Sequence, residues 1–193
     1  MVMIKFSADQ TKGNPLSPLS YATPRMGFGR LILTFTRWRR AVHAGRFIGR
    51  GQQHLDIGCG DGYFLERSPC QERIGLDLLL GDKLEDTAIF PDGHFDIVTM
   101  LAVIEHLPDP DTMFREAARL LRTGGKFIIT TPKVSAEKFI RLYASEVDNE
   151  HLSHFDLERI KGMMGPWFEL EAYRTFLLGM NQVFCLKKAP KAR

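Results

Sequence analysis

The sequence has few cysteines, and none is spaced as disulfides or metal sites usually require. Cys59, Cys70 and Cys185 are an odd number, and no two of them form a Cys-x-x-Cys pair. This pattern argues against a disulfide framework and against a cysteine zinc site. It is typical of a reducing compartment.

Long apolar runs are missing as well. No stretch approaches the ~18 to 20 apolar residues that are needed to span a bilayer. The amino terminus also lacks the charged-then-apolar order of a secretory signal. We therefore expect a cytoplasmic protein.

What is present is the composition of an ordinary globular protein. The 193 residues are 44% hydrophobic and 25% charged, with a formal net charge of +3. A chain of this length can bury a sizeable core in one domain. We expect a single domain, with residues 1–50 as an amino-terminal arm and Arg-rich helical lid and residues 51–193 as the core. No feature of the sequence specifies an oligomeric state.

The first fifty residues divide into two parts. Residues 1–21 contain glycine and proline without hydrophobic periodicity, so we expect a loose arm there. From residue 28 to 48, apolar residues recur at helical spacing and arginines lie mostly between them, which predicts an amphipathic helix. The apolar positions are Leu31, Phe35, Trp38 and Val42, and the basic ones are Arg37, Arg39, Arg40 and Arg46.

After this helix, strand and helix patterns alternate. Short apolar or β-branched runs predict strands at residues 54–57, 73–78, 95–101, 126–131, 168–176 and 181–187. Short helices are expected near residues 63–67 and 156–164. A longer helix should start at Asp109 and Pro110 and end at Gly124-Gly125. This order predicts an α/β fold with a mostly parallel sheet, helices on both faces and an antiparallel edge from the last two strands.

The most informative segment is a strand that ends in alternating glycines. It reads Leu-Asp-Ile-Gly-Cys-Gly-Asp-Gly over residues 55–62. Glycine permits both a tight turn and close approach of the backbone to a ligand, and the next helix points its N–H groups to the same place. The dinucleotide fingerprint Gly-x-Gly-x-x-Gly is not met, because Tyr63 stands where its third glycine should be.

With Asp56 ahead of the glycines, this segment resembles motif I of the class I S-adenosylmethionine-dependent methyltransferases. Three later segments resemble further motifs of that family in the same order: residues 90–98, 103–107 and 121–126. The resemblance extends from about residue 54 to residue 187. It implies a Rossmann-like sheet, S-adenosylmethionine as cofactor and S-adenosylhomocysteine as product.

The resemblance also implies a set of residues at the cofactor. Asp77 stands where the family has an acid that accepts hydrogen bonds from both ribose hydroxyls. The full expected set is Asp56, Gly58, Cys59, Gly60, Gly62, Asp77, Leu78, Asp82, Leu101 and Ala102.

One departure from the family lies between the second and fourth strands of its pattern. Residues 78–95 are too few for the usual helix and third strand, so we expect an abbreviated connection there. An acid in this region contacts the adenine amino group in the family. Asp82 or Asp86 could fill that role, and both could equally be solvated loop acids.

Transfer to a hydroxyl acceptor needs a base, and histidine is the natural candidate near neutral pH. His106 follows the strand at residues 95–101. His151 and His154 lie in a segment that resembles one found before the last helix in many small-molecule members of the family, where it can face the acceptor pocket. We name His106 and His151 as candidate catalytic residues, against the alternative that each is structural. Glu105-His106 resembles quinone-type O-methyltransferases, but Ala102 stands where some of these have a second glutamate for a metal, so we expect no metal.

The Arg-rich helix has three interpretations. It could lie on an anionic membrane surface, contact nucleic acid, or cap the cofactor site with its apolar face packed on the domain. The third is favoured because family members commonly carry such a lid.

The acceptor is expected to be a small or lipid-linked molecule. A nucleic-acid methyltransferase is an alternative, although residues 100–102 lack the Asn/Asp-Pro-Pro-aromatic signature of base amino-group methylation. A second alternative is a protein that binds S-adenosylmethionine without catalysis.

Overall fold

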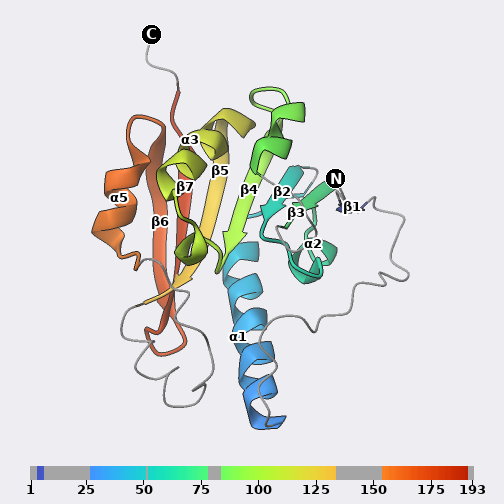
Figure 1. The fold of residues 1–193 in the computed structure, drawn as a ribbon, viewed down its shortest axis with the longest axis vertical. Coiled ribbons are helices and arrows are strands. Elements are labelled where there is room, and N and C mark those ends of the chain that lie inside the picture. Colours follow the sequence, from blue (N-terminus) through green and yellow to red (C-terminus); the bar gives the residue numbers. More distant parts are fainter. Residues whose placement is uncertain (1–3, 7–26, 51, 78–83, 134–153, 191–193) are drawn as a thin grey trace.

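The computed structural model describes residues 4–6, 27–50, 52–77, 84–133 and 154–190. They form one seven-stranded sheet with helices on both faces (Figure 1). The strands are β1 Ile4–Phe6, β2 Gln53–Ile57, β3 Glu72–Leu76, β4 Phe95–Leu101, β5 Leu121–Pro132, β6 Phe168–Phe176 and β7 Asn181–Lys188.

The strand order is β1-β3-β2-β4-β5-β7-β6. β3, β2, β4 and β5 pair in parallel, β7 runs antiparallel to both β5 and β6, and β1 runs antiparallel to β3. The predicted mostly parallel sheet with an antiparallel edge is therefore confirmed. All four parallel strands end at the same edge of the sheet, which is where ligands bind in open α/β folds.

The expectation of an arm without regular structure was wrong for residues 4–6. These residues pair with β3 from Ile4 opposite Gly75 to Phe6 opposite Arg73. A strand of three residues is too short to show hydrophobic periodicity, and backbone hydrogen bonds to an open sheet edge are enough to form it.

The short connection between β3 and β4 explains why the outer edge of β3 is open to β1. Among its described residues it contains only the 3₁₀ helix η2, Leu84–Ile89, and no strand. The abbreviated connection predicted from the sequence is thus confirmed, and β1 takes the outer place beside β3.

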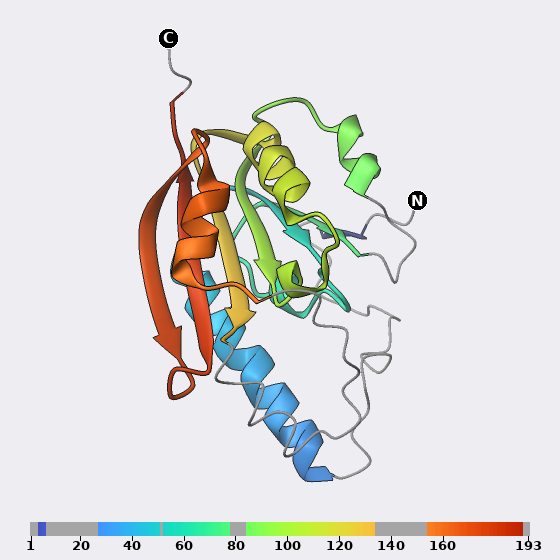
Figure 2. The same cartoon turned by 60° about the vertical axis from the view of Figure 1, so that its left-hand side comes forward.

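Helices cover both faces of the sheet. α3, Pro110–Leu120, and α5, Leu157–Met164, pack on one face, and α1, Gly27–Gly45, and the short α2, Tyr63–Glu66, pack on the other (Figure 2). The alternation of side chains along the strands supplies both cores, since Val98 faces α3 while Ile97 faces α1. None of the helices in the described ranges combines the length and the apolar character needed to span a bilayer.

Helix α3 begins as the sequence predicts but ends earlier. The Asp109 carboxylate accepts a hydrogen bond from the backbone N–H of Thr112 at 3.0 Å, and Pro110 opens the helix. The helix ends at Leu120, however, because Leu121 is already extended and fully buried as the first residue of β5. Gly124, with a φ of 75°, lies inside this strand, where the pairing with β4 is irregular, and does not end the helix.

Candidate functional site

The glycine turn between β2 and α2 lies at the carboxyl edge of the parallel strands. Gly58, Gly60 and Gly62 have φ values of 76°, 56° and 78°. Residues that carry a side chain rarely adopt such values. A Cβ atom on Gly58 would also lie 2.1 Å from Cγ2 of Val103, in the segment after β4. Gly58 is therefore required by its packing as well as by its backbone conformation.

Asp77 holds the middle of this turn. It follows β3, is 5% exposed, and its Oδ2 accepts a hydrogen bond from the N–H of Gly60 at 2.7 Å. The N–H of Gly58 donates to the Leu76 carbonyl at 2.8 Å. The turn is thus fixed to the end of β3 with the Asp77 carboxylate beside it, where the sequence analysis expected it.

The Cys59 side chain points into the domain. It is 6% exposed, and a Cβ on Gly75 would lie 2.6 Å from its Sγ. Cys59 therefore locks the turn against β3, and only its backbone is available to a ligand.

Asp56 ends a buried chain of hydrogen bonds that joins β2, β4 and the loop after α2. The hydroxyl of Thr99 donates to Asp56 Oδ1 at 2.5 Å, and Nε2 of His54 lies 2.8 Å from that hydroxyl oxygen. Nδ1 of His54 lies 2.9 Å from the hydroxyl oxygen of Ser68. Burial lowers the pKa of His54 to about 3, so the imidazole is neutral and can accept from Ser68 while it donates to Thr99.

Burial has the opposite effect on the carboxyl group at the end of this chain. It raises the pKa of Asp56 to about 7, the Thr99 hydrogen bond lowers it, Asp77 raises it and Arg37 lowers it. Asp56 was expected at the site from the sequence, whereas His54 and Thr99 were not. The sequence marks His54 and Thr99 only as polar residues within strands that are otherwise expected to be buried.

A cavity of about 80 Å³ opens beside Asp56 under helix α1. Its lining combines basic and acidic side chains with the glycine turn: Arg37, Arg40, Ala41, Asp56, Gly58, Cys59, Tyr63, Phe64 and Leu101. Arg40 also donates from Nε to the Asn181 side-chain oxygen at 3.2 Å. Residues from α1, β2 and β4 are therefore brought together at one place.

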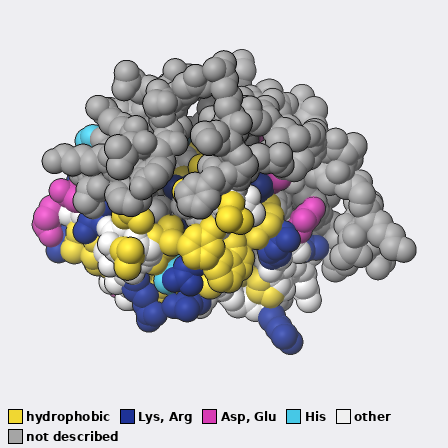
Figure 3. Space-filling model, turned by 90° about the horizontal axis from the view of Figure 1, so that it is seen from below, with side chains coloured by type: hydrophobic (Ala, Val, Ile, Leu, Met, Phe, Trp, Pro, Cys, Tyr) yellow, Lys and Arg dark blue, Asp and Glu magenta, His cyan; other side chains and the backbone are white. Residues whose placement is uncertain are grey.

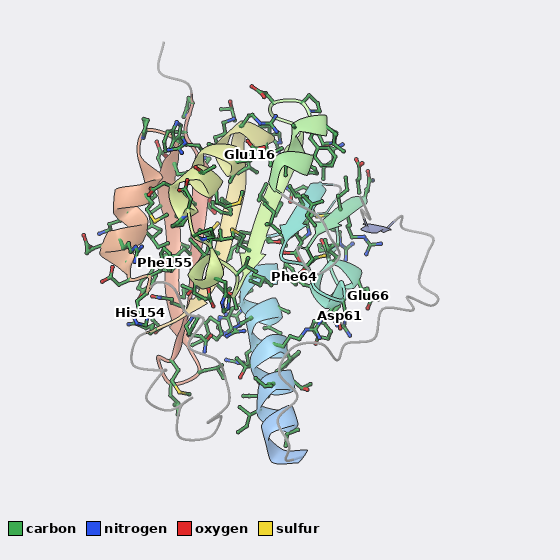
Figure 4. All side chains as sticks on the ribbon, in the orientation of Figure 1. Asp61, Phe64, Glu66, Glu116, His154 and Phe155 are labelled. Atoms are coloured by element: carbon green, nitrogen blue, oxygen red, sulfur yellow. The ribbon has the colours of Figure 1, made fainter. Side chains whose placement is uncertain are left out.

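Arg37 ties helix α1 to the glycine turn. Its guanidinium donates two hydrogen bonds to the carboxylate of Asp61, which in turn accepts from the N–H of Tyr63 at 3.1 Å. The Arg37 guanidinium also lies 4.4 Å from the centre of the Tyr63 ring. Figure 4 shows Asp61 and Phe64 beside the inner part of α1. The sequence analysis did not identify this contact.

The segment after β4 completes the site. Ala102 has a φ of 59°, which costs a residue with a side chain about 1 to 2 kcal/mol, and its N–H donates to the Thr130 carbonyl at 2.8 Å. The 3₁₀ helix η3, Ile104–His106, follows, and the His106 side chain is exposed. Leu101 and Ala102 therefore lie at the edge where the sequence placed them, with His106 close behind.

Glu105 is a further buried group that the sequence analysis mentioned only within a motif. It is 2% exposed, and its Oε2 atom has no hydrogen-bond partner among the described residues. Burial lowers the pKa of Arg40, and the charge of Glu105 raises it. The described residues hold no group of three or more side chains able to bind a metal.

Three expected site residues lie outside the described residues: Leu78, Asp82 and His151. His154 is described and exposed, and Figure 4 places it at the same end of the sheet as Asp61 but on the opposite side of the molecule.

Residues 33–165 match a family model described as a methyltransferase domain. A segment of 106 residues is 31% identical to a protein of Xanthomonas oryzae named ubiquinone biosynthesis O-methyltransferase. This match covers 42% of the chain and 43% of the relative, so it spans less than half the length of that relative.

Two solved structures show the same fold at low identity. One is a chain of the complex that contains the Haloferax volcanii Trm112 methyltransferase activator, with a TM-score of 0.67 at 15% identity, covering 84% of this chain and 95% of that chain. The other is Haemonchus contortus phosphoethanolamine N-methyltransferase 2 in complex with S-adenosyl-L-methionine, with a TM-score of 0.56 at 17% identity, covering 79% of this chain and 53% of that one.

Proposed function

This chain belongs to the class I S-adenosylmethionine-dependent methyltransferases, and on that premise we propose that it methylates a hydroxyl oxygen of a small-molecule acceptor. The observation that carries the choice of oxygen is the relative from Xanthomonas oryzae, which is named an O-methyltransferase of ubiquinone biosynthesis. The cofactor supplies an electrophilic methyl group on a sulfonium. The protein must hold the acceptor in line with it and exclude water.

The lining of the small cavity fits the amino-acid end of the cofactor. Cofactor pockets usually have about 300 to 1,000 Å³, so a cavity of about 80 Å³ can hold only one end. Arg40 would bind the carboxylate of that end, and ionised Asp56 would bind its ammonium group. Asp77 would accept hydrogen bonds from the ribose hydroxyls while it keeps its bond to Gly60.

The raised pKa of Asp56 makes this binding depend on pH. Asp56 is protonated below about pH 7 and cannot pair with an ammonium group. The dissociation constant for S-adenosylmethionine should therefore rise about tenfold per pH unit below 7. Calorimetry at pH 5.5, 6.5 and 7.5 measures this, and Asp56→Asn should bind weakly at all three. His54 stays neutral over this range and adds no charge change.

The stability of the ligand-free protein should change in the opposite direction. Between 3.8, the ordinary pKa of an aspartate in an unfolded chain, and the folded-state pKa of about 7, the folded protein holds a proton on Asp56 that the unfolded chain lacks. The proton on folded Asp56 therefore adds to the free energy of unfolding. This added stability is fully present below the unfolded pKa and is lost as the pH rises through 7. If the wild type and Asp56→Asn show the same pH dependence of binding and of unfolding, Asp56 has neither role.

His106 is the proposed general base that takes the proton of the acceptor hydroxyl. It is exposed just after the strained Ala102, at the edge where the cofactor would lie. His106→Gln should lower kcat about 100-fold, because general-base catalysis contributes about 10² to 10⁴, and should leave cofactor affinity unchanged. His94→Gln is the matched control, since His94 precedes β4 at the other end of the strand and stacks on Phe90. A kcat for His106→Gln within twofold of wild type would exclude His106 as the base.

The test of the proposed function is a transfer assay with S-adenosylmethionine labelled in its methyl group. The acceptors are aromatic molecules with one or two ring hydroxyls, each compared with the analogue that carries an amine instead. We expect label on oxygen, and on the amines little or none. Transfer to the amines alone would refute the oxygen acceptor, and cofactor binding without any transfer would indicate a binding protein.

A further inference from the structure

Helix α1 does not pack as the sequence predicts. Its expected apolar face is turned away from the domain, with Leu31 65%, Phe35 49% and Trp38 45% exposed. The face that packs on the sheet contains the small residues Ala41 and Ala44, and the buried His43 stacks on Phe176 of β6. The favoured interpretation, a lid with its apolar face on the domain, is therefore wrong for these residues. The small side chains of Ala41 and Ala44 allow the helix to approach the sheet closely. The large side chains of Leu31, Phe35 and Trp38 are then left on the surface.

Three of the exposed residues lie on one side of the helix, and two more lie around it. Leu31, Phe35 and Trp38 are four and three residues apart, so they lie on the same side of the helix. The Phe35 and Trp38 rings are in contact, with centroids 5.6 Å apart. Ile32 and Leu33 are exposed as well, at 39% and 48%. We call these five residues the α1 apolar surface.

The α1 apolar surface is concentrated on one element. Of the seven large hydrophobic side chains that are exposed among the described residues, five belong to it, and the others, Ile89 and Leu178, lie singly elsewhere. Figures 1 and 2 show α1 extending beyond the end of the sheet at which β4 terminates. The surface continues into a groove of about 250 Å³, lined by Trp38, Val42 and Phe64 among others.

Among the described residues near this surface, basic side chains outnumber acidic ones. Helix α1 contains no Asp or Glu. Arg39 is partly exposed with its guanidinium 5.7 Å from the centre of the Trp38 ring, and Arg67 is exposed and lines the same groove as Trp38. Arg46 is exposed just after the carboxyl end of the helix. The two acids nearby are both paired with arginine: Asp61 binds Arg37, and Glu66 lies 3.6 Å from Arg67. Figure 3 looks at this end and shows the hydrophobic side chains with Lys and Arg side chains beside them.

An apolar helix end with arginines beside it, and with the nearby described acids paired to arginine, is the pattern of a helix that lies in a membrane interface. We propose that α1 binds this protein to the surface of an anionic lipid bilayer, with Leu31, Phe35 and Trp38 in the acyl boundary and Arg39 and Arg46 at the phosphates. The arginines favour an anionic bilayer, because a basic side chain near an anionic leaflet is attracted to it. The inference rests on exposure and charge and does not depend on the proposed acceptor.

The first experiment measures sedimentation of the full chain with lipid vesicles. The probes are vesicles of pure phosphatidylcholine and vesicles with one third phosphatidylglycerol. Wild type should bind the anionic vesicles and be released at high salt. Phe35→Ser with Trp38→Ser should bind at least tenfold more weakly. The matched control is Ile89→Ser with Leu178→Ser, which removes two apolar side chains that are at least as exposed and should bind like wild type.

Calorimetry with S-adenosylmethionine shows whether each variant is folded, because Phe35 and Trp38 do not line the cavity beside Asp56. Equal vesicle binding by the two double variants, or none by the wild type, overturns the proposal. The outcome is separable from that of the transfer assay, since no acceptor is used.

The second experiment follows Trp38 itself. Trp167→Phe leaves it as the single tryptophan. Without lipid, its emission should be that of an exposed indole that acrylamide quenches, and anionic vesicles should shift the emission to shorter wavelength and protect it. If Trp38 is already protected without lipid, another part of the chain covers it. If it becomes protected as the protein concentration rises, a second copy covers it. Either result refutes the membrane proposal.

Discussion

Asp77→Ala is expected to weaken the binding of S-adenosylmethionine by about 10- to 100-fold, as measured by calorimetry at pH 7.5. The loss of a hydrogen bond to a charged group costs about 1.5 to 3 kcal/mol, and a bidentate contact to two ribose hydroxyls loses at least that. The same change removes the acceptor for the Gly60 N–H, which binds Asp77 at 2.7 Å. The glycine turn then loses its link to the end of β3, so the affinity falls for two reasons.

Asp77→Asn separates the two contributions. It keeps an oxygen for the Gly60 N–H but loses the charge, so its affinity should lie between wild type and Asp77→Ala. Asp111→Ala, an exposed acid in α3, is the control and should bind normally. Wild-type affinity in Asp77→Ala would mean that the cofactor does not use the end of β3.

Gly58→Ala is expected to destabilise the fold by about 2 to 5 kcal/mol, which is a large part of the 5 to 15 kcal/mol of a typical domain. The φ of 76° costs an alanine about 1 to 2 kcal/mol. Its Cβ would lie 2.1 Å from Cγ2 of Val103, and overpacking of that kind costs about 1 to 3 kcal/mol more. Denaturant unfolding measures the sum.

The packing part can be isolated with a second substitution. Val103→Ala removes the atom that clashes, so the double variant should be more stable than the two single effects added together. Gly162→Ala is the matched control, because Gly162 lies in α5 with open space around it and alanine favours helix there. If Gly58→Ala unfolds like wild type, the turn is not held as described.

The sequence predicted the central sheet well because its signals are local. β4 and β7 contain runs of apolar residues, and the Asp109-Pro110 cap marks the start of α3 within a few positions. The glycine turn and Asp77 could also be found, since each depends on one strand end. The abbreviated connection after β3 followed from counting residues.

The errors concern contacts between distant segments. β1 depends on an open edge that only the assembled sheet creates, and no local pattern announces it. The orientation of α1 was misjudged because periodicity identifies an apolar face but not what it meets. Ala41 and Ala44 bring that helix onto the sheet, and they are too small to stand out in a hydrophobic pattern. The pairing of Arg37 with Asp61 is likewise visible only in three dimensions.

The antiparallel β1 also has a protective role. A free outer edge on β3 would present unpaired N–H and C=O groups, which recruit strands from other molecules. β1 occupies that edge with only three residues, from Ile4 to Phe6, opposite Gly75 to Arg73. Because its partner lies so far along the chain, this pairing cannot form until β3 has been made and folded. Because β1 is made before β3, the strand that covers this edge is already present when the edge forms.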